Sequence, residues 1–217
     1  MRRAPDLSLY LVTDRGCAGA RGVLEVVRAA LRGGVSMVQL RDPLAKTAEL
    51  VAEARALLRL LEPHGVPLII NDRVDVALAA GAHGVHIGQS DMRAADARAL
   101  LGPQRLLGFS ISSLAQLRAA ELPLLDYLGV GPIFDTPTKP DADPAIGLAG
   151  LSEIAAHCPL SIVAIGGLNA SNAEQVIEAG AHGIAVVSAI CAAAEPERAA
   201  RELAGGVQRA LASRAAR

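Results

Sequence analysis

The chain has 217 residues, of which 21 are Lys or Arg and 22 are Asp or Glu, giving a formal net charge of −1. Nucleic-acid-binding proteins usually carry a basic excess or a basic stripe, so this balance and an aromatic content of 2% exclude that class. No run approaches the ~18 apolar residues that span a bilayer, and the three cysteines lack the spacing of a disulfide framework or metal site. We therefore expect a cytoplasmic protein that binds neither nucleic acids nor membranes.

Short β-branched runs alternate with longer Ala- and Leu-rich runs along the whole chain. The short runs are nearly continuously apolar, which is typical of strands buried on both faces of a parallel sheet. Strands are expected over residues 7–13, 35–41, 67–71, 84–88, 105–110, 126–131, 161–166 and 183–188. Eight β-α units without a linker predict one α/β domain over residues 1–217, a (βα)8 TIM barrel with a parallel eight-stranded core.

The clearest helical pattern covers residues 47–61. Leu50, Leu57 and Leu61 fall on one face at helical spacing, and charged residues take the opposite face. Thr47 is expected to cap the start of this helix.

Two segments resemble each other, AAGAHGV at residues 79–85 and EAGAHGI at residues 178–184. In each, one glycine follows an Ala-rich helix and a second glycine opens the next strand. His83 and His182 are therefore expected on the side where strands enter the barrel, in structural roles.

Polar and glycine residues gather at the carboxyl ends of the expected strands, where a TIM barrel builds its active site from the βα loops. The residues of interest at this rim are Gln39, Arg41, Asn71, Asp72, Asp91, Ser110, Thr136, Thr138, Lys139, Gly166, Gly167, Val187 and Ser188.

Asp72 and Asp91 follow adjacent strands and each precedes an Ala-rich helix. Either residue alone is readily explained as a helix N-cap. Two carboxylates at neighbouring points of one rim also suit Mg²⁺, which binds through one or two carboxylates, waters and substrate phosphates. Both interpretations stay open from the residues alone.

The glycine pair Gly166-Gly167 lies where barrels frequently bind a phosphate, after the seventh strand. Glycines let the backbone approach an oxyanion closely, and Ser188 is expected to precede the last helix, whose N-terminus attracts anions. The alternative for the glycine pair is a tight βα turn.

Arg41 and Lys139 are cations at the same rim. Each alone is readily explained as a solvated side chain. Together with a metal ion and Ser110 they would form a clamp that stabilises a departing polyphosphate. The residues thus predict a barrel with two anion sites and name no substrate.

A series of motifs carries a resemblance to a known family. These are VQLRD (38–42), IND (70–72), HIGQSD (86–91), GFS (108–110), GVGPIFDTPTKPD (129–141), AIGG (164–167) and VSAI (187–190). In order and spacing they resemble thiamine phosphate synthase, a family of (βα)8 transferases. Its members join hydroxymethylpyrimidine pyrophosphate to a thiazole phosphate and release pyrophosphate, with a pyrimidine carbocation as the intermediate that the thiazole nitrogen captures.

The resemblance implies a role for each matching residue. It implies that one Mg²⁺ is bound by Asp72 and Asp91. It implies that the pyrimidine pyrophosphate is contacted by Gln39, Arg41, Asn71, Ser110 and Lys139. It implies that the thiazole phosphate is bound by Thr136, Thr138 and the backbone at Gly167, Val187 and Ser188. Arg41, Ser110 and Lys139 are the residues expected to act in catalysis.

One position departs from the family pattern. Where the family commonly has a pyrophosphate-binding lysine after Q-L-R-x, this chain has Pro43. Lys46 lies three residues further on and either reaches the site or is turned away by the proline.

Two other functions compete with the synthase. A paralogous barrel that tautomerises the thiazole would use an active-site histidine as acid and base, and would lack the paired aspartates. A sensor of thiamine precursors would bind without turnover. Assembly into an oligomer of identical chains is left open.

Overall fold

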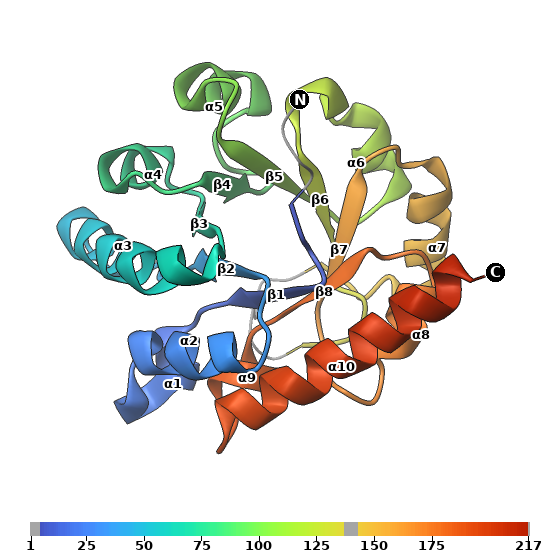
Figure 1. Ribbon diagram of the computed structural model, residues 1–217. Helices are drawn as coiled ribbons and strands as arrows, with labels where there is room; N and C mark the ends of the chain where they lie inside the picture. The colour runs from blue at the N-terminus through green and yellow to red at the C-terminus, as the bar shows by residue number, and fades with distance from the viewer. Residues whose placement is uncertain (1–4, 137–142, 217) are drawn as a thin grey trace.

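The computed structural model describes residues 5–136 and 143–216. Within them, eight parallel strands pair in chain order and close into a barrel, surrounded by helices (Figure 1). The predicted TIM-barrel fold is confirmed. The strands are β1 (Leu9–Val12), β2 (Met37–Leu40), β3 (Leu68–Asn71), β4 (Gly84–Ile87), β5 (Leu106–Ile111), β6 (Tyr127–Val130), β7 (Ser161–Ile165) and β8 (Gly183–Val186).

The helices follow the strands in alternation. In the described residues they are α1 (Arg15–Ala18), α2 (Val23–Arg32), α3 (Thr47–Leu61), α4 (Val74–Ala80), α5 (Ala94–Leu101), α6 (Leu114–Ala119), α7 (Gly147–His157), α8 (Ala173–Glu178), α9 (Ser188–Cys191) and α10 (Pro196–Ala215). Three short 3-10 turns are η1 (Gly19–Arg21), η2 (Glu62–His64) and η3 (Leu122–Leu124). Among these segments, none is both long and apolar enough for a membrane crossing.

Helix α3 has the predicted bounds, and Leu50, Leu57 and Leu61 are buried against the barrel as expected. The predicted capping role of Thr47 is wrong, because the N-cap is Lys46. The Thr47 hydroxyl instead accepts a hydrogen bond from Arg73 at 2.8 Å. Thr47 therefore ties the start of α3 to the next βα unit.

The apolar core has two parts. The larger one lies between the strands and the surrounding helices, and α10 helps to cover it by packing against both α2 and α8 (Figure 1). The smaller one fills the barrel interior and consists of Leu7, Tyr10, Val12, Met37, Ile69, Tyr127, Val163 and Ala185. Aliphatic side chains dominate, as the composition predicts, but two tyrosines occupy the interior.

The two repeated glycine-histidine segments lie at the end of the barrel where the strands begin. His83 accepts the backbone N–H of Leu68 at 3.0 Å, and His182 accepts that of Ile162 at 3.1 Å. Both bonds reach the start of the neighbouring strand, β3 or β7, so the predicted strand-entry placement of these histidines is confirmed.

Gly84 is expected to be required for barrel closure. A Cβ there would overlap the backbone of Leu106 on β5, so Gly84→Ala is expected to lower the free energy of unfolding by about 3 kcal/mol. Gly206→Ala in α10 is the control, since its Cβ would meet only the Arg209 guanidinium at 3.9 Å, and alanine favours a helix by up to ~1 kcal/mol. Urea unfolding measures both, and an unchanged midpoint for Gly84→Ala would contradict the expectation.

Candidate active site

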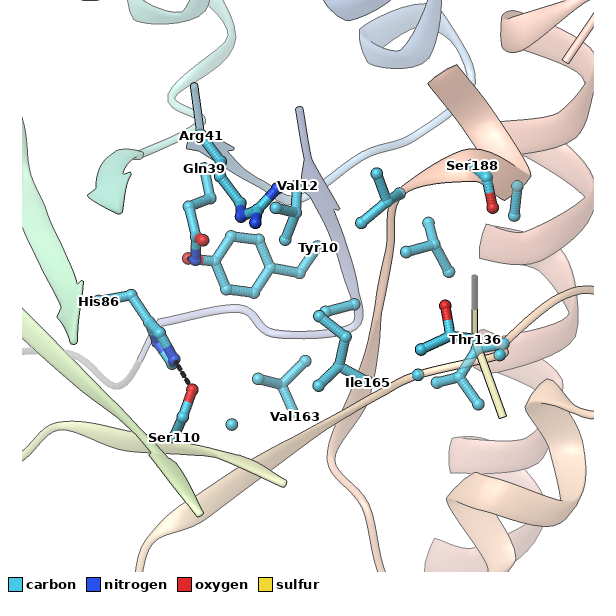
Figure 2. A pocket seen from close by; sticks show the side chains of 18 of the residues that line it. Tyr10, Val12, Gln39, Arg41, His86, Ser110, Thr136, Val163, Ile165 and Ser188 are labelled. Carbon is cyan, nitrogen blue, oxygen red and sulfur yellow. Dashed lines mark hydrogen bonds between the residues drawn. The ribbon is translucent and has the colours of Figure 1, made fainter. Parts of the chain in front are cut away.

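A cavity of about 440 Å³ lies at the carboxyl ends of the strands (Figure 2). This volume is within the range of small-molecule sites, roughly 300–1,000 Å³. The lining residues are Tyr10, Val12, Gln39, Arg41, Asn71, His86, Ser110, Gly129, Thr136, Val163, Ile165, Gly166, Gly167, Leu168, Asn169, Ala185, Val186, Val187, Ser188 and Ala189.

Arg41 supplies positive charge to one part of this cavity. Its backbone N–H donates to the Thr13 hydroxyl at 3.1 Å, which holds the turn after β2. Its guanidinium lies 3.6 Å from the Asp14 carboxylate and remains 24% exposed. The ion pair orients Arg41 and leaves donors available to an anionic ligand.

The loop after β7 presents backbone to another part of the cavity. Gly166 and Gly167 have positive φ values of 102° and 65°. A Cβ at Gly167 would lie 2.7 Å from the Asp135 carbonyl oxygen, so close packing here requires glycine. Asn172 donates to the Gly167 carbonyl at 3.0 Å and fixes the turn. The glycine pair is thus a tight turn that also lines the cavity.

Ser188 follows β8 on the same side of the cavity. It does not precede the last helix as predicted, because it is the first residue of the separate four-residue helix α9, and α10 begins at Pro196. The sequence carries a signal for this break that the prediction overlooked, because Pro196 stands at the first position of α10. Loops after strands seven and eight, with a short extra helix, are a frequent phosphate site in this fold.

The floor of the cavity is a chain of hydrogen-bonded side chains. Gln39 Nε2 donates to the Tyr10 hydroxyl at 2.8 Å, and the hydroxyls of Tyr10 and Tyr127 lie 3.0 Å apart. The Tyr127 hydroxyl is 3.1 Å from His86 Nδ1. Figure 2 shows the next bond, in which His86 Nε2 is 2.8 Å from Ser110 Oγ. Buried polar groups are stable when hydrogen-bonded in this way.

Burial makes this floor electrically neutral. Desolvation lowers the pKa of His86 from 6.5 to about 4, although the nearby negative charge of Asp91 opposes the shift. Desolvation also raises the pKa values of Tyr10 and Tyr127. At neutral pH none of the three carries a charge.

The helix-cap alternative for Asp72 and Asp91 is wrong. The N-cap of α4 is Arg73 and that of α5 is Arg93. Asp72 is also a non-glycine residue with a φ of 61°, a conformation that is uncommon outside functional or strained positions.

Both aspartates are held at the rim by hydrogen bonds. Asp72 Oδ2 accepts from Asn71 Nδ2 at 2.6 Å, and Asp91 Oδ2 accepts from the Gly88 backbone at 2.7 Å. Neither lines the cavity directly. Asn71 does line it and therefore connects the Asp72 carboxylate to the cavity.

The cavity brings together residues that the sequence analysis selected from six different strands. Those that line it are Gln39, Arg41, Asn71, Ser110, Thr136, Gly166, Gly167, Val187 and Ser188. Thr138 and Lys139 lie outside the described residues. Lys46 is exposed and lines neither this cavity nor the neighbouring hollow beside Arg15, Asp42 and Pro43.

Sequence reasoning missed Tyr10 and Tyr127 as cavity-floor residues. The available signal was the scarcity of aromatics, since the chain has only two tyrosines and two phenylalanines and both tyrosines lie within expected strands. His86 is a packed, hydrogen-bonded residue, because it is buried and both ring nitrogens have partners.

Burial of neutral His86 predicts a pH-dependent stability. The unfolded imidazole takes up a proton below about pH 6.5 and the folded one only near a pKa of about 4, so the free energy of unfolding falls as pH drops through this window. His86 is expected to account for about 2 kcal/mol of that fall by about pH 5. Urea unfolding should show a flatter pH dependence for His86→Gln, and an unflattened one for the exposed-site control His64→Gln. Equal slopes in His86→Gln and the wild type would contradict this.

Comparisons with known proteins agree with this geometry. A family described as thiamine monophosphate synthase matches residues 9–190. The thiamine-phosphate synthase of Azorhizobium caulinodans is 58% identical over 198 residues, which cover 91% of this chain and 93% of that protein. The thiamine-phosphate synthase of Xanthobacter autotrophicus is 57% identical over 202 residues, which cover 93% of this chain and 96% of that protein.

A solved structure gives the same result in three dimensions. Thiamine phosphate pyrophosphorylase from Pyrococcus furiosus aligns with a TM-score of 0.87 and 37% identity, covering 96% of this chain and 98% of that one. The chain therefore belongs to the thiamine monophosphate synthase family.

Proposed function

We propose that this enzyme transfers the hydroxymethylpyrimidine group from its pyrophosphate to hydroxyethylthiazole phosphate, giving thiamine phosphate and pyrophosphate. The observation that carries the proposal is one cavity with two parts suited to anions. Arg41 and Asn71 line one part, and the Gly166-Gly167 turn and Ser188 line the other. Two phosphorylated substrates require two such parts facing one reaction space.

The donor set at the rim fits one Mg²⁺. Asp72 and Asp91 offer hard carboxylate oxygens, and one oxygen of each is already oriented by an N–H donor. Magnesium needs only one or two carboxylates when waters and phosphate oxygens complete its shell. When bound, it would neutralise charge on a pyrophosphate leaving group.

The side chains beside the pyrimidine pyrophosphate would assist its departure. The bond from the pyrimidine methylene carbon to oxygen breaks, and its electron pair leaves with the pyrophosphate. Arg41 and the Ser110 hydroxyl would donate hydrogen bonds to the oxygens that gain charge. The resemblance assigns Lys139 to the same task. No acid–base triad is needed for this step.

The remaining walls would protect the cation. Val163, Ile165 and Val187 line the cavity with apolar surface. Such a lining excludes water, which otherwise competes for the carbocation. The thiazole nitrogen then donates its lone pair to the methylene carbon and forms the new C–N bond, while its phosphate is held by Thr136, Gly167 and Ser188, and by Thr138 as the resemblance implies.

A thiazole tautomerase would need a histidine that exchanges protons with its substrate. His86 lines the cavity, but hydrogen bonds to Tyr127 and Ser110 engage both of its ring nitrogens. This arrangement favours the synthase. A sensor that binds without turnover is distinguished by the release experiment below.

We extend the proposal to a cytoplasmic location. Cys17, Cys158 and Cys191 form no disulfide. Burial raises the pKa of each thiol, that of Cys191 to about 11. Such thiols stay reduced and unreactive in a reducing compartment.

Pyrophosphate release tests the proposed function directly. Purified protein should release pyrophosphate only when both substrates are present, and EDTA should abolish release until Mg²⁺ is restored. Asp72→Asn and Asp91→Asn are each expected to lower turnover on the order of 10²-fold. Asp75→Asn, an exposed carboxylate near Asp72, is the matched control with near-normal turnover. Binding of both substrates without release would favour the sensor.

The role of Arg41 beside the departing pyrophosphate is tested by a pair of substitutions. Arg41→Ala is expected to raise the KM for the pyrimidine pyrophosphate about 10- to 100-fold, because a charge-assisted hydrogen bond is lost. Lys46→Ala should leave that KM unchanged, since Lys46 is exposed and lines no part of the cavity. A comparable rise for Lys46→Ala would show that Lys46 replaces the lysine absent at Pro43.

A further inference from the structure

The hydrogen-bonded chain on the cavity floor joins two residues expected to touch the pyrimidine substrate, Gln39 and Ser110, through three that are not. Tyr10 and Tyr127 are 1% and 0% exposed, and His86 is 8% exposed. These hydrogen bonds cross the barrel in order from β2 through β1, β6 and β4 to β5. They therefore link opposite walls of the cavity through the interior.

The neighbouring strands leave room for this chain. A Cβ at Gly108 would overlap both the Tyr127 ring and the His86 imidazole, and a Cβ at Gly129 would lie 2.9 Å from His86 Cε1. Glycine at these two positions allows the tyrosine and histidine to meet. The contact between Tyr127 and His86 therefore depends on glycine at one position of β5 and one position of β6.

The donor-to-acceptor direction of this hydrogen-bonded chain follows from its first donor, Gln39. The Gln39 amide nitrogen can only donate, so the Tyr10 oxygen accepts from it. The buried Tyr10 hydroxyl hydrogen needs an acceptor of its own, and the Tyr127 oxygen at 3.0 Å provides it. The Tyr127 hydrogen then goes to His86 Nδ1, which must be bare. The proton of neutral His86 is left on Nε2.

The bond between His86 and Ser110 determines which way the Ser110 hydroxyl hydrogen points. His86 Nε2–H donates to Ser110 Oγ, so the Ser110 hydrogen is turned away from the histidine. Ser110 lines the cavity, and its hydroxyl is thereby presented as a donor. Successive bonds in a low-dielectric interior polarise one another, which strengthens the final donor.

We propose that Tyr10, Tyr127 and His86 are positioning residues that hold the Ser110 hydroxyl as a hydrogen-bond donor to the pyrimidine pyrophosphate. The identity of this acceptor rests on the proposed function. The direction of the chain rests only on the contacts within the protein.

Nitrogen-15 NMR of histidine-labelled protein without substrate tests the direction. His83 and His182 are internal references, because each accepts a backbone N–H at Nδ1 and therefore carries its proton on Nε2. The His86 signal, assigned by its loss in His86→Gln, should show the same tautomer. A proton on Nδ1, or a mixture of both tautomers, would overturn the proposal.

A double-mutant cycle tests the action through Ser110. Tyr10→Phe and Tyr127→Phe are each expected to lower kcat/KM for the pyrimidine pyrophosphate about 10-fold, with the KM for the thiazole phosphate unchanged. In a Ser110→Ala background the same substitutions should have no further effect, whereas general damage to the barrel would add to that of Ser110→Ala. Additive losses, or full activity of both single variants, would overturn the proposal.

Ile69→Val is the matched control for these variants. Ile69 belongs to the same interior cluster, lines no part of the cavity and loses only a methyl group. It should keep wild-type kinetics. A wild type that releases no pyrophosphate would contradict the proposed function, while the NMR experiment, which needs no substrate, would still decide the direction of the chain.

Discussion

Closure of the barrel between β8 and β1 is the constraint on which the site depends. Leu9 and Ile184 face each other across this pair, and Gly183 packs so close to Leu7 that a side chain would overlap its carbonyl. Because all eight strands are parallel, closure brings their carboxyl ends to one rim. Gln39 and Ser188, distant in sequence, share a cavity for this reason.

The barrel interior combines an apolar cluster with a polar chain that such an interior tolerates only when fully hydrogen-bonded. Tyr10 and Tyr127 contact each other edge-to-face at a centroid distance of 6.1 Å, so their rings fill the interior while their hydroxyls meet. Tyrosine suits this position because its ring is apolar and its tip is polar. One pair of residues thus serves both packing and the orientation of the site.

Local patterns predicted the parts of this structure that depend on local causes. Strand and helix positions followed from hydrophobic periodicity, and the helix over residues 47–61 was correct in both bounds. The rim residues followed from the rule that barrel sites lie after the strands. Contacts between distant strands were not predictable: nothing near Tyr10 indicates Tyr127, which is 117 residues away. The partner that diverts Thr47 from capping, Arg73, is likewise in another βα unit.

The neutrality of the cavity floor has a consequence for the proposed chemistry. Among the described residues that line the cavity, Arg41 is the only one with a permanent charge. A protonated His86 would add a positive charge on the cavity floor and raise the free energy of the pyrimidine carbocation. Burial prevents this by lowering the His86 pKa to about 4. Desolvation thus keeps His86 neutral. The hydrogen-bonded floor can then direct a donor, the Ser110 hydroxyl, at the leaving pyrophosphate without adding a charge that repels the pyrimidine carbocation.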